Sequence, residues 1–350
     1  MMSRRFFQNR EVILGLLGLG LLLVSALSLG MGAVSITSGE ILVFLQAKLT
    51  GAPVDGLHDA VIYSIRAPRI LFGALVGATL GVAGAGLQGI FRNPLADPGL
   101  IGVTSGAALA VATTMILLPA TGVASGILGE LAIPLGGFLG GLAVTALVYR
   151  LATSHGKTEV TTMLLAGIAI NAFAGAGLGL LVYISDDNQL RDFTMWTLGG
   201  LGGTQWKHLY IAAPVGLIAL GGLLVHWRAL NAMLLGESEA FHLGIDADGV
   251  KKRVVFFAAL AVGATVGYAG MIGFVGLVVP HLLRLLGGAD HRFVLPGSAL
   301  LGALLLVGAD SLARTIAAPA EIPIGILTAL VGAPFFLWLL LRQRQRGFQW

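Results

Sequence analysis

The sequence contains no cysteine, which excludes a disulfide scaffold, a cysteine nucleophile and a thiolate metal site. It is also poor in charge. Only 11% of its 350 residues are charged, against the ~25% that is typical of soluble globular proteins. A chain of this length with so few charges cannot cover a water-exposed surface, so a soluble enzyme is excluded. Because 56% of the residues are apolar, the sequence predicts an integral membrane protein.

Nine uncharged apolar runs are long enough to be membrane helices, since a helix needs ~20 mostly apolar residues to cross the hydrocarbon core. They lie at 12–39, 70–91, 98–129, 131–149, 160–185, 208–227, 254–283, 293–309 and 322–341. The run 254–283 is long for one span and contains Gly263, Gly267, Gly270, Gly273, Gly276 and Pro280. It forms either one kinked helix or two shorter helices that meet at a reversal near 268–273.

The distribution of Lys and Arg favours the reversal, because cytoplasmic loops of membrane proteins carry an excess of these residues. With a reversal the chain has ten spans and two cytoplasmic termini, and fifteen of its 21 Lys and Arg lie on the cytoplasmic side. The other six are Lys48, Arg66, Arg69, Arg191, Lys207 and Arg314. Without the reversal the split is eleven to ten. We therefore predict an all-α integral membrane protein with ten transmembrane helices, in one domain over residues 1–350.

Pairs of glycines four residues apart predict close packing between these helices, because small residues let two backbones approach each other in lipid. The pairs are Gly73/Gly77, Gly77/Gly81, Gly136/Gly140 and Gly175/Gly179.

Motifs for nucleotide binding are incomplete. Gly84-x-Gly86-x-x-Gly89 lies inside an apolar span, whereas a dinucleotide-binding loop joins a strand to a helix. Gly156-Lys157-Thr158 lacks the first glycine of a phosphate loop, because position 151 is Leu. We therefore expect no ATP site and no resident cofactor on this chain.

Acidic residues offer one alternative, a membrane prenyltransferase that holds Mg²⁺ and a diphosphate. Asp186, Asp187 and Asp192 could supply carboxylates for this ion. The second acidic pair, Asp246 and Asp248, lies on the opposite face of the membrane in the ten-span topology. The two groups then cannot share a site, so we expect neither a metal site nor a catalytic residue.

Three stretches carry a resemblance to a known family. They are Arg66–Arg69 with Gln88–Gly102, Gly273–Arg284 with Asp290–Arg292, and the C-terminal set of 310–314, 321–328 and 332–336. From about Val12 to Arg342 the chain resembles the membrane permease subunit of type II ABC importers for iron–siderophores, haem and cobalamin. The resemblance implies ten membrane helices per subunit and a bacterial inner-membrane protein. It also implies a homodimer with the passage on its axis, two ATPase subunits that bind ATP and Mg²⁺, a soluble binding protein, and no nucleic acid.

The resemblance also implies roles for individual residues. Arg66, Arg69 and Arg314 match arginines that pair with glutamates of the binding protein, the alternative being lipid-headgroup anchors. Within the loop 228–253, the family's ATPase-coupling element matches Leu235, Gly236, Glu237, Glu239, Ala240, Leu243 and Gly244. Ala240 and Leu243 are expected to enter a groove of the ATPase, the alternative being an ordinary loop. One cytoplasmic gate matches Asn93 and Leu95, and the other matches Thr161 and Thr162, or their neighbour Val160.

The cargo is the least constrained part of the prediction. Residues 185–199 resemble the haem branch of the family more than the siderophore or cobalamin branches. We therefore expect haem as the cargo, with ferric siderophore or cobalamin as alternatives within the same class. A passive channel, which would need no ATPase, is the remaining alternative.

Overall fold

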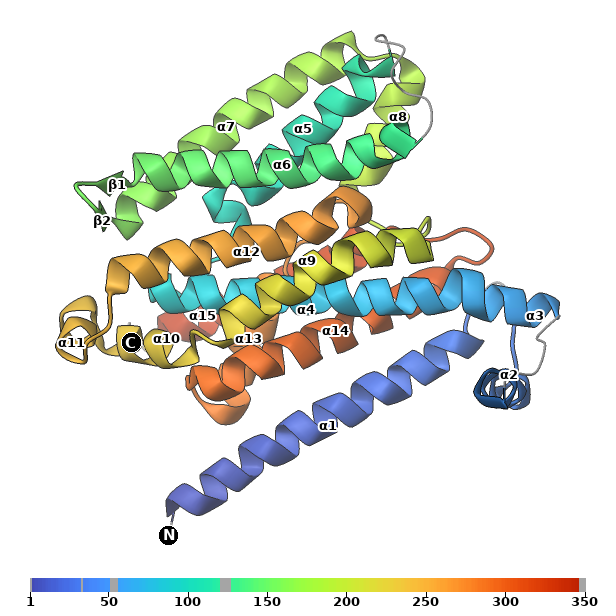
Figure 1. Ribbon diagram of the computed structural model, residues 1–350, viewed down its shortest axis with the longest axis horizontal. Helices are drawn as coiled ribbons and strands as arrows, with labels where there is room; N and C mark the ends of the chain where they lie inside the picture. Colours follow the sequence, from blue (N-terminus) through green and yellow to red (C-terminus); the bar gives the residue numbers. More distant parts are fainter. Residues whose placement is uncertain (1, 33, 51–55, 120–126, 346–350) are drawn as a thin grey trace.

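The computed structural model describes residues 2–32, 34–50, 56–119 and 127–345. The chain is almost entirely helical (Figure 1). Its elements are α1 (Met2–Gly30), α2 (Ser38–Thr50), α3 (Leu57–Ala60), a π-helical turn (Val61–Arg66), α4 (Ala67–Phe91), a 3-10 turn (Pro98–Ile101), α5 (Val103–Leu117), α6 (Ile127–Leu151), β1 (Thr153–Ser154), β2 (Lys157–Thr158), α7 (Val160–Ile184), α8 (Asp187–Thr197), α9 (Trp206–Leu224), α10 (Trp227–Leu235), α11 (Glu237–His242), α12 (Ala247–Ala269), α13 (Val275–Gly287), α14 (His291–Ile316) and α15 (Ile324–Gln345).

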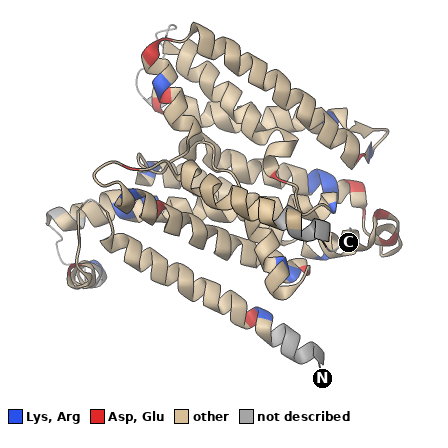
Figure 2. Cartoon of the chain, turned by 180° about the vertical axis from the view of Figure 1, so that it is seen from behind, with Lys and Arg blue, Asp and Glu red and all other residues tan. Residues whose placement is uncertain are grey.

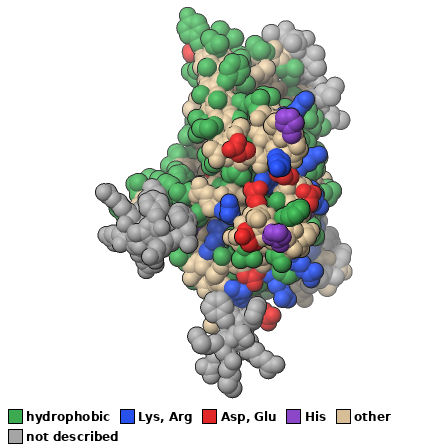
Figure 3. Space-filling view, turned by 90° about the vertical axis from the view of Figure 1, so that its left-hand side faces the viewer, with side chains coloured by type: hydrophobic (Ala, Val, Ile, Leu, Met, Phe, Trp, Pro, Cys, Tyr) green, Lys and Arg blue, Asp and Glu red, His purple; other side chains and the backbone are tan. Residues whose placement is uncertain are grey.

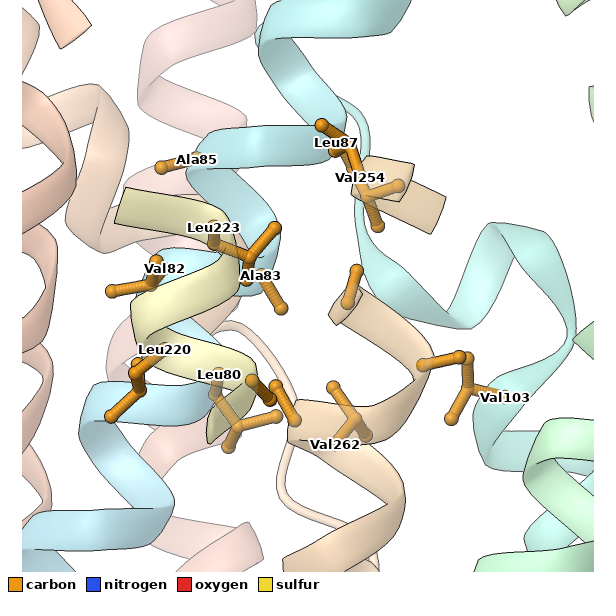
Figure 4. Close-up of a cluster of buried hydrophobic side chains, with 14 of the residues drawn as sticks. Leu80, Val82, Ala83, Ala85, Leu87, Val103, Leu220, Leu223, Val254 and Val262 are labelled. Carbon is orange, nitrogen blue, oxygen red and sulfur yellow. The ribbon is translucent and has the colours of Figure 1, made fainter. Parts of the chain in front are cut away.

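Helix α4 forms the centre of the molecule and is buried over most of its length. Helices α9, α12, α13 and α14 pack around it, and α1 packs on α14. Helices α5, α6, α7 and α8 form a second group beside α12 (Figure 1). In the core, aliphatic side chains of α4 such as Val82 and Leu87 face Leu223 of α9 and Val254 of α12 (Figure 4). This apolar contact between α4 and its neighbours holds the helix bundle together.

Glycine allows α4 to lie directly against the backbone of α14. A Cβ on Gly77 would collide with the carbonyl oxygen of Gly302, and one on Gly81 would collide with that of Ser298. The predicted packing role is therefore confirmed for this glycine series. It is also confirmed for Gly140 of α6, whose added Cβ would collide with α5.

The glycine pair on α7 behaves differently. A Cβ on Gly175 or Gly179 would meet no atom of this chain within 4 Å. The close approach predicted for this pair is absent within the described part of the chain.

The run 254–283 consists of two helices, α12 and α13, as the charge distribution predicts. Helix α12 ends at Ala269 and is followed by Gly270, whose φ of 70° favours glycine. Helix α13 begins at Val275, with Gly276 against Gly84 in the second half of α4. It ends near α1, where the Arg10 Nε donates a hydrogen bond to the Gly287 carbonyl oxygen at 2.7 Å. The chain therefore reverses between the two helices.

Charged residues gather at the two ends of the helices (Figure 2). One end, which we term the α11 end, holds α10, α11, β1, β2 and the start of α1 (Figure 1). The other, the α2 end, holds α2, α3, α8 and the start of α4. The six Lys and Arg assigned to the outer side by sequence all lie on elements at the α2 end. These six residues thus lie on one side of the helix bundle, which agrees with their assignment to one side of the membrane.

Seven helices in the described residues are long and apolar enough to cross a membrane. They lie at Asn9–Gly30, Val61–Phe91, Gly129–Leu151, Val160–Ile184, Trp206–Leu224, Ala247–Ala269 and His291–Ile316. Three shorter apolar helices accompany them, at Val103–Leu117, Val275–Gly287 and Ile324–Trp338. A membrane protein with several spans is therefore supported, whereas the number ten and the orientation of the termini stay predictions.

Candidate functional site

Residues 235–244, which we term the α11 segment, project from the α11 end as a short helix bounded by two glycines. Gly236 separates α10 from α11 with φ 127°, and Gly244 follows α11 with φ 77°. Both angles lie in the region that favours glycine, because a Cβ is strained there. The predicted loop 228–253 is therefore mostly helical, with α10, α11 and the first turns of α12.

Ala240 lies on the inner side of the α11 segment. It is fully buried against the core, so the expectation that it inserts into a groove of another subunit is wrong for this structure. The exposed apolar side chains of the segment are Leu235, Phe241 and Leu243, which are 66%, 74% and 62% exposed. Figure 3 looks onto this end, where apolar side chains lie among charged ones. Phe241 was not predicted from the sequence, although a single aromatic residue beside four polar residues and one alanine is a signal that could have identified it.

A groove of about 780 Å³ lies beside the α11 segment. It is lined by Lys157, Thr158, Glu237, Ser238, Phe241, Gly244, Ile245, Asp246, Ala247, Asp248 and Lys251. Lys251 is 1% exposed, although it is one of three consecutive basic residues that the sequence places on the cytoplasmic side. Neither its burial nor its partners were predicted, because a buried lysine has no local sequence signal.

The gate residues predicted from the family occupy two separate turns at the α11 end. The Asn93 side chain accepts a hydrogen bond from the Leu95 amide at 2.9 Å, as expected for a turn residue before proline. Thr161 is exposed on the first turn of α7, and Thr162 donates to the Glu159 carboxylate at 2.6 Å. Among the described residues, no hydrogen bond joins one turn to the other. Their role as gates stays a prediction.

Three arginines that the sequence assigns to one side of the membrane lie together at the α2 end. Arg69 lies 2.8 Å from Asp310 and 2.8 Å from Glu321, measured from its Nη2 and Nη1 atoms. Arg314 Nε lies 3.1 Å from the other oxygen of Asp310. Arg66 donates to the carbonyl oxygens of Leu29 and Val34. Two carboxylates therefore lie within a group of three guanidinium cations.

This arrangement differs from the expected exposed cations. Arg66, Arg69 and Arg314 are 3%, 4% and 6% exposed, so none presents a free guanidinium in the isolated chain. The exposed member of the group is Glu321, whose side chain is 45% exposed. Neither Glu321 nor Asp310 was assigned a role from the sequence, although each lies in a stretch that carries the family resemblance. Docking by these arginines stays a prediction.

A second groove, of about 430 Å³, lies between α5, α7 and α8. Its wall includes polar groups as well as apolar ones. Ser105 donates to the Asn171 side chain at 2.5 Å, and Asn171 donates to the Gly99 carbonyl oxygen at 3.1 Å. The wall of this groove therefore presents hydroxyl, amide and carbonyl groups beside its apolar surface.

The motifs set aside by sequence have structural explanations. Gly84 and its neighbours lie within α4, and Gly156 forms the turn between β1 and β2 with φ 80°. Asp186 caps α8 by accepting hydrogen bonds from the amides of Asn188 and Gln189. It lies at the α2 end, whereas Asp246 lies at the α11 end. Within the ranges that the structure describes, no acidic and histidine side chains cluster as metal ligands.

Comparison with known proteins identifies the family. The model of the FecCD transport family matches residues 20–342. This chain belongs to the FecCD family. Among curated relatives, the hemin transport system permease protein HmuU of Yersinia pestis is 44% identical over 94% of this chain and 96% of its own length. The cobalamin import system permease protein BtuC of Halobacterium salinarum is 44% identical over 81% of this chain and 73% of its own.

A solved structure shares the fold of this FecCD protein. It shows, in an inward-facing conformation, a transporter described as of the metal-chelate ABC type. The two chains are 34% identical, with a TM-score of 0.82 over 95% of this chain and 99% of the other. The chain is thus an ABC transporter permease, as its motifs predict, and the prenyltransferase alternative is excluded.

Proposed function

We propose that this chain is the membrane subunit of an ATP-driven importer that carries haem into a bacterial cytoplasm. Two copies would form a homodimer with the passage on its axis, in the inner membrane. The observation that carries the importer mechanism is the α11 segment, whose Leu235, Phe241 and Leu243 expose an apolar surface at a charged end of the molecule. An amphipathic helix of this kind suits a groove in a partner protein, and here the partner is the ATPase subunit.

The α7 face with Gly175 and Gly179 supports the homodimer. Only 11% of the most apolar part of α7 is buried within the chain. A helix with small residues on an open face permits close approach of a second helix in lipid. We propose that this face of α7 meets the second copy and lines the passage, together with Asn171 from the neighbouring groove.

The α2 end receives the soluble binding protein in this proposal. The arginine group contributes three positive charges against the two carboxylates of Asp310 and Glu321. The resulting excess of positive charge would steer an acidic surface of the binding protein, although the guanidinium groups lie beneath the surface. Asn93, Leu95, Thr161 and Thr162 would close the passage at the α11 end.

Haem is proposed as cargo because the hemin permease HmuU matches nearly the whole chain. Cobalamin is the second candidate, because a cobalamin permease is equally identical over a shorter range. The test is uptake into proteoliposomes that contain the permease, its ATPase and its binding protein. We expect ATP-dependent accumulation of haem that excess cobalamin or ferric siderophore does not reduce. Uptake without ATP would instead indicate a passive channel.

The orientation can be tested with single cysteines, since the chain has none of its own. Asn188 on α8 and Ser238 on α11 are both exposed. A membrane-impermeant thiol reagent should label Asn188→Cys from outside and Ser238→Cys only after the membrane is opened. Labelling of both from one side would overturn the orientation proposed here.

A further inference from the structure

Lys251 places a positive charge in the interior of the α11 end, which is costly unless the charge is paired and hydrogen-bonded. Its side chain is 2% exposed. The ammonium group has three donors, and three acceptors lie around it. They are the Thr158 carbonyl oxygen at 2.8 Å, a Glu237 oxygen at 2.7 Å and an Asp248 oxygen at 3.3 Å. Every donor of the buried lysine can therefore be satisfied.

These three partners belong to three different segments. Glu237 is the first residue of α11, Asp248 lies in the first turn of α12, and Thr158 ends β2 just before α7 begins at Val160. The same Asp248 oxygen also accepts a hydrogen bond from the Thr158 amide at 2.9 Å. Lys251 and Asp248 thus hold the Thr158 residue by both its carbonyl and its amide group. Glu237 connects this assembly to α11.

One ion pair joins this assembly to α11. Among the described residues, Glu237–Lys251 is the only salt bridge that α11 forms. Glu237 is 43% exposed in its side chain, so it lies where a bound partner would press on α11. A bond of 2.7 Å leaves little freedom, because hydrogen bonds are lost when the donor and acceptor separate by much more than 3.2 Å. A shift of α11 must therefore either carry Lys251 with it or break the pair.

We propose that Lys251 is a positioning residue that transmits the movement of α11 to the start of α7. The proposal rests on the proposed function, in which an ATPase moves the α11 segment. Thr158 is three residues before Thr161, the predicted gate residue on the first turn of α7. The lysine therefore links the surface that meets the ATPase to the residue that closes the passage.

The test uses single cysteines at Thr161 in the complete complex of permease, ATPase and binding protein. With the native lysine we expect ATP to change the thiol-labelling rate of Thr161→Cys several-fold. Adding Glu237→Gln removes the α11 carboxylate that pairs with Lys251 and leaves the contacts of Lys251 with Thr158 and Asp248 in place. The ATP-dependent change should then fall below twofold, and uptake per ATP hydrolysed should fall about tenfold, since a charge-assisted hydrogen bond is replaced by a weaker one.

Matched variants separate positioning from stability. Lys251→Met should lose the same response, and Lys252→Met, at the exposed neighbouring position, should keep it. If Lys251→Met fails to assemble, Glu237→Gln still decides, because its carboxylate is half exposed. If ATP still changes the labelling rate of Thr161→Cys when Glu237→Gln is present, the inference about Lys251 is overturned and the proposed function is not. If ATP does not change the labelling rate of Thr161→Cys in the otherwise native complex, the proposed function is overturned, and the inference with it.

Discussion

Arg69 and Asp310 form a buried ion pair, with Nη2 2.8 Å from Oδ1 and side chains that are 5% and 2% exposed. Asp310 serves two cations, because its second oxygen lies 3.1 Å from the Arg314 Nε. One carboxylate thus joins the start of α4 to the end of α14. Removing one partner of a buried pair is costly, since the remaining charge stays buried without compensation.

We therefore expect Asp310→Ala to destabilise the permease by about 3 kcal/mol or more. Glu321→Gln is the matched control. It removes a carboxylate from the same arginine, but its side chain is 45% exposed, so we expect a cost of about 1 kcal/mol or less. Thermal unfolding of the two purified variants in detergent measures the difference. Equal unfolding midpoints for both variants would show that the buried pair contributes no more to stability than the exposed one.

The same Glu321→Gln variant tests docking at the α2 end. Loss of the exposed carboxylate raises the net positive charge beside Arg69 without disturbing the buried pair with Asp310. We expect a faster association with the binding protein at low ionic strength, and a steeper decrease of the rate with salt. Stopped-flow mixing at two salt concentrations gives both quantities. An unchanged association rate at low salt would show that the arginine group does not take part in docking.

Sequence patterns predicted the helical membrane fold and the break in the long run 254–283. These features follow from local composition: long apolar runs, glycines and the positions of Lys and Arg. The α11 segment and the arginine group were located differently, by their resemblance to family motifs. Neither composition nor resemblance predicted the direction of individual side chains, because direction depends on packing between distant segments. Ala240 points inward and Phe241 outward, and the difference of one residue follows from how α11 lies on α12.

The burial of individual charged side chains was the second feature that could not be predicted from the sequence. Lys251 and Lys252 are identical neighbours, yet the first is buried and the second exposed. The partners of Lys251 come from residues 158, 237 and 248, which only the folded chain brings together. Likewise, the pairing of Arg69 with Asp310 joins residues 241 positions apart.

Close packing of α4 on α14 gives a prediction about Gly77. A methyl group at this position collides with backbone, namely the Gly302 carbonyl, which cannot rotate away. We expect Gly77→Ala to cost about 1–3 kcal/mol, as for overpacking of a core. In Gly221→Ala of α9 the added Cβ meets nothing within 4 Å. That control should keep or raise the unfolding temperature, because alanine favours a helix.

Asp290 gives a prediction about acid stability at the α11 end. Partial burial raises its pKa, but hydrogen bonds from Asn231, the Arg292 amide and Arg10 outweigh it, and the net pKa lies below the ordinary 3.8. A group with a lowered pKa stabilises the fold above its unfolded pKa and loses that contribution as the pH falls through the folded value. We expect native stability to decline below about pH 4, and Asp290→Asn to decline less over this range. Unfolding midpoints from pH 6 to pH 3 test this, and parallel curves would contradict it.

The last prediction separates Ala240 from Phe241, two neighbours with opposite environments. Phe241 is 74% exposed, so Phe241→Ala should leave the unfolding temperature of the permease unchanged. It should weaken binding of the ATPase, because an aromatic anchor at an interface centre contributes about 2 kcal/mol or more, some thirtyfold in affinity. Ala240 is fully buried, so Ala240→Arg should lower the unfolding temperature of the permease alone, as an uncompensated buried charge does.

Ala240→Ser is the control for volume, and Phe241→Leu the control for apolar surface, which should retain part of the affinity. Unfolding in detergent measures the first quantity, and titration of the ATPase onto immobilised permease measures the second. Ala240→Arg should lower the stability of the permease, whereas Phe241→Ala should lower its affinity for the ATPase. If Phe241→Ala binds the ATPase as tightly as the native chain does, the exposed face of α11 is not the contact surface, and the importer mechanism proposed from it fails.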